Sequence, residues 1–109
     1  MSSSNNHYIE LTLIFEKEDD GRWTAECQEL GTAIYSYSFE KAQEEIIEAI
    51  DLHLEGLCEV GELKRFFDEN NIKIKEKPSR QKIIKATKRP NAYYNAFDYK
   101  VNQGAMACL

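Results

Sequence analysis

The sequence predicts an α+β fold in which an antiparallel sheet of three to four strands packs against one long and one short helix, in the order β-β-β-α-α-β. Two patterns lead to this prediction. Apolar and polar residues alternate around residues 9–15 and again around 23–27, which indicates two strands with one buried face each. A helical period of apolar residues then runs from Ser38 to Leu57, the longest periodic segment in the chain.

Short turn sequences separate the predicted strands. Residues 18–21 read Glu-Asp-Asp-Gly, and the Asp-Gly step favours a hairpin between the first two strands. Gly31 precedes a β-branched and aromatic segment at residues 32–37, which predicts a third strand. We expect these three strands to present one apolar face to the long helix.

The long helix has two chemically different sides. Ser38 carries the hydroxyl of a good N-cap. The apolar side, which we expect to be buried, consists of Phe39, Ala42, Ile46, Ala49, Ile50, Leu54 and Leu57. A second row with the same spacing is acidic and consists of Glu40, Glu44, Glu48, Asp51 and Glu55. Like charges four residues apart destabilise a helix by about 0.2–0.5 kcal/mol per pair, so helix stability does not explain the later acids of this row.

Shorter elements are predicted after the long helix. Gly56 and Gly61 favour a break in the helix, and residues 62–69 have the pattern of a short second helix. The Asn70-Asn71 step is suited to the left-handed end of that helix, and residues 72–75 alternate as a short fourth strand.

Charge divides the 109-residue chain into two parts. The net charge is −5, but the chain up to Ile72 holds 5 Lys or Arg against 17 Asp or Glu, whereas the rest holds 9 against 2. We therefore expect a flexible N-terminus at residues 1–7, one compact domain at 8–77, and a basic, aromatic-containing tail at 78–109. On this division, removal of the tail leaves the fold intact.

Several function classes find no support in the sequence. No apolar run approaches the length of a membrane span and the N-terminus is polar, so we expect a cytoplasmic protein without membrane contact. Cys27, Cys58 and Cys108 have wide spacings, which favour neither structural zinc nor a disulfide framework. His7 and His53 lie far apart, and no nucleophile and base occur in a recognisable set. We expect no catalytic residue, no cofactor and no metal site.

One run of residues, from the second strand into the long helix, carries a family resemblance. Residues 23–33 read Trp-Thr-Ala-Glu-Cys-Gln-Glu-Leu-Gly-Thr-Ala, residues 39–42 read Phe-Glu-Lys-Ala, and Ala49-Ile50 follow with Leu52 and Leu54. Over residues 8–75 the chain resembles the HicB-like antitoxin family. Where that family has Gly, an acid and Thr before the helix, this chain has Ser36, Tyr37 and Ser38, which keeps the capping hydroxyl.

The resemblance implies a fold, a function and two kinds of partner. Family members have a three-stranded antiparallel sheet and a long helix, similar to a truncated ribonuclease H or double-stranded-RNA-binding domain. They neutralise HicA, a small basic ribonuclease toxin that cleaves mRNA, and they form dimers or larger oligomers. The resemblance therefore implies a HicA-like toxin and further copies of this chain as partners. Residues after Lys75 lack the two amphipathic helices of the DNA-binding domain that many members carry.

Two charged surfaces are candidate binding sites. The acidic helix row would attract the cationic surface of a nuclease, although a row kept only for solubility has the same pattern. The tail pairs aromatic residues with basic ones, a composition that suits single-stranded nucleic acid; the basic residues are Arg80, Lys82, Lys85, Lys88 and Arg89. The simpler hypothesis is that the tail is poorly ordered or folds back onto an acidic body.

Two functions from different classes follow from these observations. The first is an antitoxin that binds a HicA-like toxin. The alternative is a stand-alone protein of the same fold that binds nucleic acid or a small ligand and has no toxin partner. A neighbouring gene for a short, basic, His-containing protein of double-stranded-RNA-binding type would favour the first.

Overall fold

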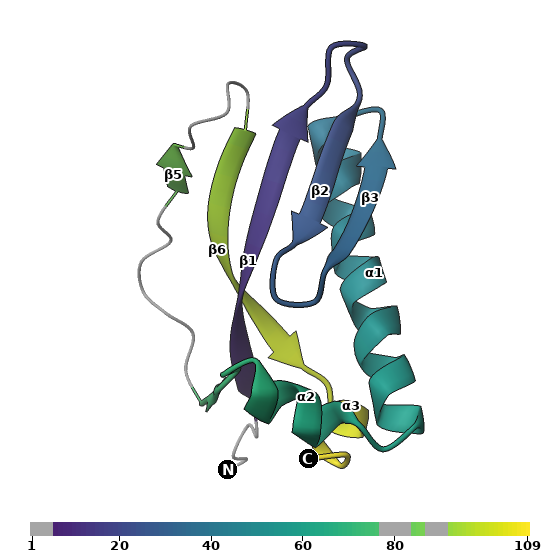
Figure 1. The fold of residues 1–109 in the computed structure, drawn as a ribbon, viewed down its shortest axis with the longest axis vertical. Helices are drawn as coiled ribbons and strands as arrows, with labels where there is room; N and C mark the ends of the chain where they lie inside the picture. Colours follow the sequence, from purple (N-terminus) through teal and green to yellow (C-terminus); the bar gives the residue numbers. More distant parts are fainter. Residues whose placement is uncertain (1–5, 77–83, 87–91) are drawn as a thin grey trace.

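The computed structural model describes residues 6–76, 84–86 and 92–109. Its elements, in chain order, are β1 (His7–Lys17), β2 (Trp23–Cys27), β3 (Thr32–Ser36), α1 (Phe39–Glu59), α2 (Leu63–Glu69), β4 (Ile74–Lys75), β5 (Ile84–Ala86), β6 (Ala92–Val101) and α3 (Gln103–Met106). An antiparallel sheet packs against helices, with α1 lying along β2 and β3 (Figure 1). The predicted α+β class is confirmed.

The described strands form one sheet, with β1 at its centre. The strand order is β3-β2-β1-β6-β5, and β4 also pairs with β1. All pairs are antiparallel. The alternation of β1 places its apolar residues in the core at 3% exposure or less: Ile9, Leu11, Leu13 and Phe15. The period-two pattern of this strand therefore indicated its buried face correctly.

The long helix begins as predicted and ends later. Ser38 is the N-cap, and its side chain accepts a hydrogen bond from the backbone N–H of Lys41 at 3.1 Å. The residues that α1 buries are Ala42, Ile46, Ile50 and Leu54. α1 continues past Gly56 to Glu59, and the chain breaks there before α2 begins at Leu63, so Gly56 and Gly61 bracket the break as predicted. A single glycine costs a helix only about 1 kcal/mol, and Leu57 still packs against the core beyond it.

The second helix and the turn after it follow the prediction. α2 buries Leu63 and Phe67. Asn71 has a φ of 54°, the left-handed conformation that its side chain tolerates. β4 is shorter than the predicted strand at 72–75, because the backbone N–H of Ile72 donates to the carbonyl of Phe67 at 2.9 Å in the turn that ends α2.

The largest difference from the expected organisation lies in the segment assigned to a tail. β6 pairs with β1 over ten residues, from His7↔Val101 to Glu16↔Ala92. Tyr99 and Val101 are each 4% exposed, so this strand completes the core. The sheet therefore continues beyond residue 77 and has six strands among the described residues. The part of the tail after residue 91 thus folds back onto the acidic body, one of the two simpler hypotheses above.

The structure describes only parts of the expected N-terminal segment and of the expected tail. His7 already belongs to β1, and residues 1–5 lie outside the described residues. Residues 84–86 form the strand β5, which pairs with β6, although they belong to the segment expected to be a tail. The rest of residues 77–91 lies outside the described residues.

The position of β6 predicts that its removal unfolds the protein. Full burial of side chains such as Tyr99 and Val101 contributes about 1.5–3 kcal/mol each, a large share of the roughly 5–15 kcal/mol that stabilises a small domain. A chain ending at residue 91 should therefore lose its cooperative thermal transition in circular dichroism. A chain ending at Val101 is the matched control, because it keeps β6 and lacks the same last residues. Equal melting of both chains would contradict this account of β6.

Candidate partner-binding surface

The acidic row of α1 lies on the exposed side of the helix. Glu40, Glu44, Glu48 and Glu55 are all exposed, and no ion pair found in the described part of the chain involves them. Over its whole length α1 carries seven Asp or Glu residues against Lys41 as its single Lys or Arg residue. This negative charge is therefore not neutralised by the described residues and is presented to solvent.

Asp51 has a different environment from the rest of the row. The hydroxyl of Tyr99, on β6, donates a hydrogen bond to Oδ1 of Asp51. Burial, together with this bond to a carboxylate, raises the pKa of Tyr99 well above its usual range, so Tyr99 stays a neutral donor. Asp51 thus connects α1 to β6, and its carboxylate is partly used in holding the fold together.

An aromatic groove lies near the start of α1, between that helix and β6. Its cavity of about 320 Å³ is lined by Phe15, Trp23, Phe39, Tyr93 and Asn95. We call this cavity and its lining residues the aromatic groove. The Trp23 ring lies 5.0 Å from Phe39 and 6.4 Å from Tyr93, centroid to centroid. The sequence did not reveal the groove, because two of its residues lie in the segment expected to be a tail.

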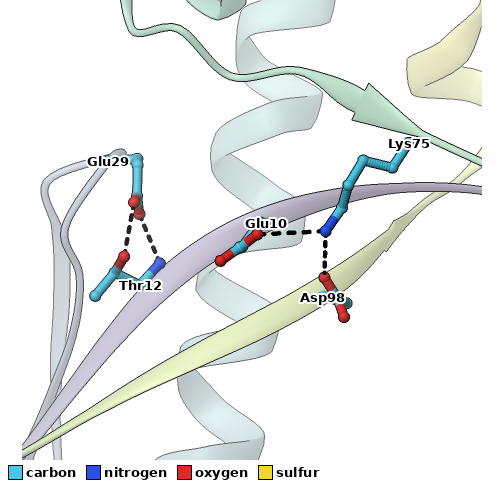
Figure 2. A network of polar contacts seen from close by, with 5 residues as sticks. All are labelled: Glu10, Thr12, Glu29, Lys75 and Asp98. Carbon is cyan, nitrogen blue, oxygen red and sulfur yellow. Dashed lines mark hydrogen bonds and ion pairs between the residues drawn. The ribbon is translucent and has the colours of Figure 1, made fainter. Parts of the chain in front are cut away.

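A second, polar cavity of about 390 Å³ lies on the other face of the sheet, beside the end of α2. Figure 2 shows that Lys75, on β4, lies between two carboxylates, with Nζ 3.3 Å from Glu10 and 3.1 Å from Asp98. Glu10 and Asp98 are direct cross-strand partners on β1 and β6, so their like charges would repel each other without Lys75. Although burial lowers the pKa of Lys75, hydrogen bonds to the two acids raise it above its usual value.

Glu29 satisfies the backbone of β1 at the edge of the same cavity. β1 pairs with β2 from Leu13 onward and with β4 at Tyr8 and Ile9, so a gap remains between the two partners. Within that gap the Thr12 N–H donates to Glu29 Oε1 at 2.7 Å, and the Thr12 hydroxyl donates to Oε2 at 2.9 Å (Figure 2). The two carboxylates that line this cavity, those of Glu10 and Glu29, are thus both used in holding strands together. We therefore assign the cavity a structural role.

His53 and Cys27 both contact residues that hold the fold together. His53 Nδ1 lies 2.9 Å from the hydroxyl of Thr32, and its ring packs near Phe66. Cys27 is fully buried, and burial raises the pKa of its thiol to about 11, so it stays protonated and behaves as a small hydrophobe. In the described ranges, no group of three or more His, Cys, Asp or Glu side chains is arranged to hold a metal ion.

The remaining cysteines are paired, which the sequence did not predict. Cys58 near the end of α1 and Cys108 after α3 form a disulfide, with a Cα–Cα distance of 5.6 Å that is normal for such a bond. The wide cysteine spacings were expected not to favour a disulfide framework, and this single bond is the part of that expectation that the structure contradicts. Fifty residues separate the two positions, and only the return of the chain through β6 brings α3 to the end of α1.

The basic residues proposed for nucleic-acid binding are not brought together in the described structure. Lys85 belongs to β5 by its backbone. The other four, Arg80, Lys82, Lys88 and Arg89, lie outside the described residues.

Comparisons with known proteins do not assign the chain to a family. No protein-family model, no curated protein and no solved structure matches it. None of the helices in the described part of the chain has the length and apolar character needed to cross a membrane. The functional assignment therefore depends on the surfaces described above and on the sequence resemblance.

The disulfide predicts a specific number of titratable thiols. Disulfides are rare in cytosolic proteins, where thiols are kept reduced. The structure therefore predicts that Cys58 and Cys108 are oxidised to a disulfide, whereas the expected cytoplasmic location predicts that both are free thiols. Protein purified without reductant and then unfolded should expose one thiol, that of Cys27, in a colorimetric thiol assay. After reduction it should expose all three. Three thiols before reduction would show that the pair is open in the purified protein.

Proposed function

We propose that this protein is a HicB-like antitoxin that binds and neutralises a HicA-like, mRNA-cleaving toxin. The observation that carries the proposal is the exposed acidic row of α1, which no described basic residue neutralises. The family resemblance supports it further, because residues 23–33 and 39–42 occupy β2, the turn to β3, and the first turn of α1.

The physical basis of this function is competition for a positive surface. A ribonuclease holds the phosphates of its substrate with Lys and Arg side chains, and a negative protein surface of similar extent can cover them. Glu44, Glu48 and Glu55 are exposed on α1 and provide such charges along a rigid helix. Opposite charge on the two proteins also speeds association, most strongly at low salt. In this proposal the chain itself catalyses no reaction.

The alternative function is that of a stand-alone binding protein of the same fold, without a toxin partner. The aromatic groove favours this alternative, because an apolar cavity of about 320 Å³ with one polar residue is typical of a small-ligand site. Nucleic acid remains the other candidate ligand, through the basic residues between β4 and β6.

Coexpression with a candidate toxin tests the antitoxin proposal. The candidate is the product of an adjacent gene that encodes a short basic protein of double-stranded-RNA-binding type. Reversal of Glu44, Glu48 and Glu55 to Lys should slow association and weaken inhibition of RNA cleavage, with the largest effect at low salt. Asp51 is kept, because its bond to Tyr99 would confuse folding with binding. Association rates over a salt series provide the measurement.

A charge-matched control separates the acidic row from net charge. Asp19, Glu26 and Glu69 are exposed and lie outside α1, so their reversal to Lys changes the net charge by the same amount. We expect this control to retain most of the inhibition. Equal losses in both triple variants would assign the effect to net charge, and absence of a complex with wild-type protein would refute the antitoxin proposal.

Self-association is a second part of the proposal. In the described sheet β3 lies at one end, so one side of its backbone has no strand partner. Tyr35 on this strand is 65% exposed, and Tyr37 just after it is 88% exposed. We expect two copies to pair along β3, and light scattering at micromolar concentration should give at least a dimer. A mass equal to one 12.6 kDa chain would contradict this expectation.

A further inference from the structure

We propose that the aromatic groove receives one apolar side chain, aromatic or branched aliphatic, from a Lys- and Arg-rich segment of a separate basic protein. This inference rests on the proposed function and specifies how that partner binds. It joins two features that the sequence does not connect: the aromatic groove and the acidic side of α1.

The face of the sheet that carries α1 is only partly covered by that helix. α1 packs closely on β2 and β3, while β6 lies on the far side of β1 (Figure 1). The register places Tyr93 opposite Phe15 and Asn95 opposite Leu13, so these two β6 residues share the face with the core. Tyr93 is nevertheless 46% exposed, because α1 does not extend over this part of β6.

An acidic side of α1 borders the uncovered region. The helical period places Glu40, Glu44 and Asp51 on one side of α1, at steps of four and seven residues. Asp51 is bonded to Tyr99 on β6, which shows that this side faces β6. Phe39 in the first turn lines the groove, Glu40 follows it directly in the chain, and Glu44 lies one turn further along the helix; both acids are exposed.

The chemistry of the groove and of its border selects the occupant. Four aromatic rings and one amide offer a cavity suited to a single large apolar side chain, the usual anchor of a protein interface. The acids of α1 require that the residues around this anchor be positive. A second copy of this chain is disfavoured, because its own α1 carries seven acids against one Lys or Arg residue and would be repelled.

Trp23 makes occupancy of the groove measurable. It is the only tryptophan in the chain and lines the cavity, so its emission reports a side chain entering there. The probe is a short lysine peptide with one central phenylalanine, and the matched peptide has glycine at that place. We expect the phenylalanine peptide to shift the emission of the full-length protein and to bind about ten-fold or more tightly than the glycine peptide.

Variants on the two faces of β6 provide the control. Tyr93→Ala should weaken binding of the phenylalanine peptide about ten-fold, whereas Tyr94→Ala, one residue along on the opposite face, should leave it unchanged. Asn95→Phe fills the cavity from within and should block binding while the fold is retained. This second variant keeps the test decisive if Tyr93→Ala is unstable by circular dichroism.

The outcomes separate this inference from the proposed function. Equal binding of the two lysine peptides, or equal effects of Tyr93→Ala and Tyr94→Ala, would overturn the groove as an anchor site. Tight binding of a phenylalanine peptide flanked by glutamate would overturn the basic partner. If Tyr93→Ala inhibits a candidate toxin as well as wild type while reversal of Glu44, Glu48 and Glu55 does not, the antitoxin proposal stands and the groove proposal fails. Conversely, if the lysine peptide with phenylalanine shifts the Trp23 emission but the protein forms no complex with the candidate toxin, the groove proposal stands and the antitoxin proposal fails.

Discussion

The pairing of β1 with three other strands is the constraint on which the rest of the structure depends. One edge of β1 is occupied by β6 over ten residues, and the other is shared by β2 and β4. Because both edges are used, every second residue of β1 is held against the core, and Ile9 and Leu11 are fully buried. The position of α1, the completion of the sheet by β6 and the return of α3 all follow from this central strand.

Two polar contacts make this shared pairing possible. Glu29 satisfies the backbone N–H of Thr12 where β1 passes from one partner strand to the next. Lys75 bridges Glu10 and Asp98, which face each other across β1 and β6, and its positive charge relieves their mutual repulsion. An unsatisfied backbone group or an unrelieved pair of like charges at this place would cost free energy comparable to a lost hydrogen bond or more. These charged residues are therefore part of the framework, unlike the exposed acids of α1.

The arrangement of β6 also creates the surface on which the functional proposals depend. β6 contributes Tyr93 and Asn95 to a cavity lined by four aromatic rings, and Phe39, in the first turn of the acidic helix α1, lines the same cavity. Attraction between exposed charges mainly accelerates encounter, while burial of an apolar anchor slows dissociation. A partner that uses both features would be drawn to α1 by charge and retained by the aromatic groove.

The sequence by itself determined the elements whose signals are local. The alternation of residues 9–15, the Asp-Gly turn, the Ser38 cap and the apolar stripe of α1 each depend on neighbours within a few residues. Only the tertiary structure decided the role of β6, because Tyr93, Tyr94, Asn95 and Ala96 follow no clean period and are placed by pairing with a strand some eighty residues away. The exposed acids were found from spacing alone. The aromatic groove and the Cys58–Cys108 bond were not, because each joins residues that meet only after β6 has docked on β1.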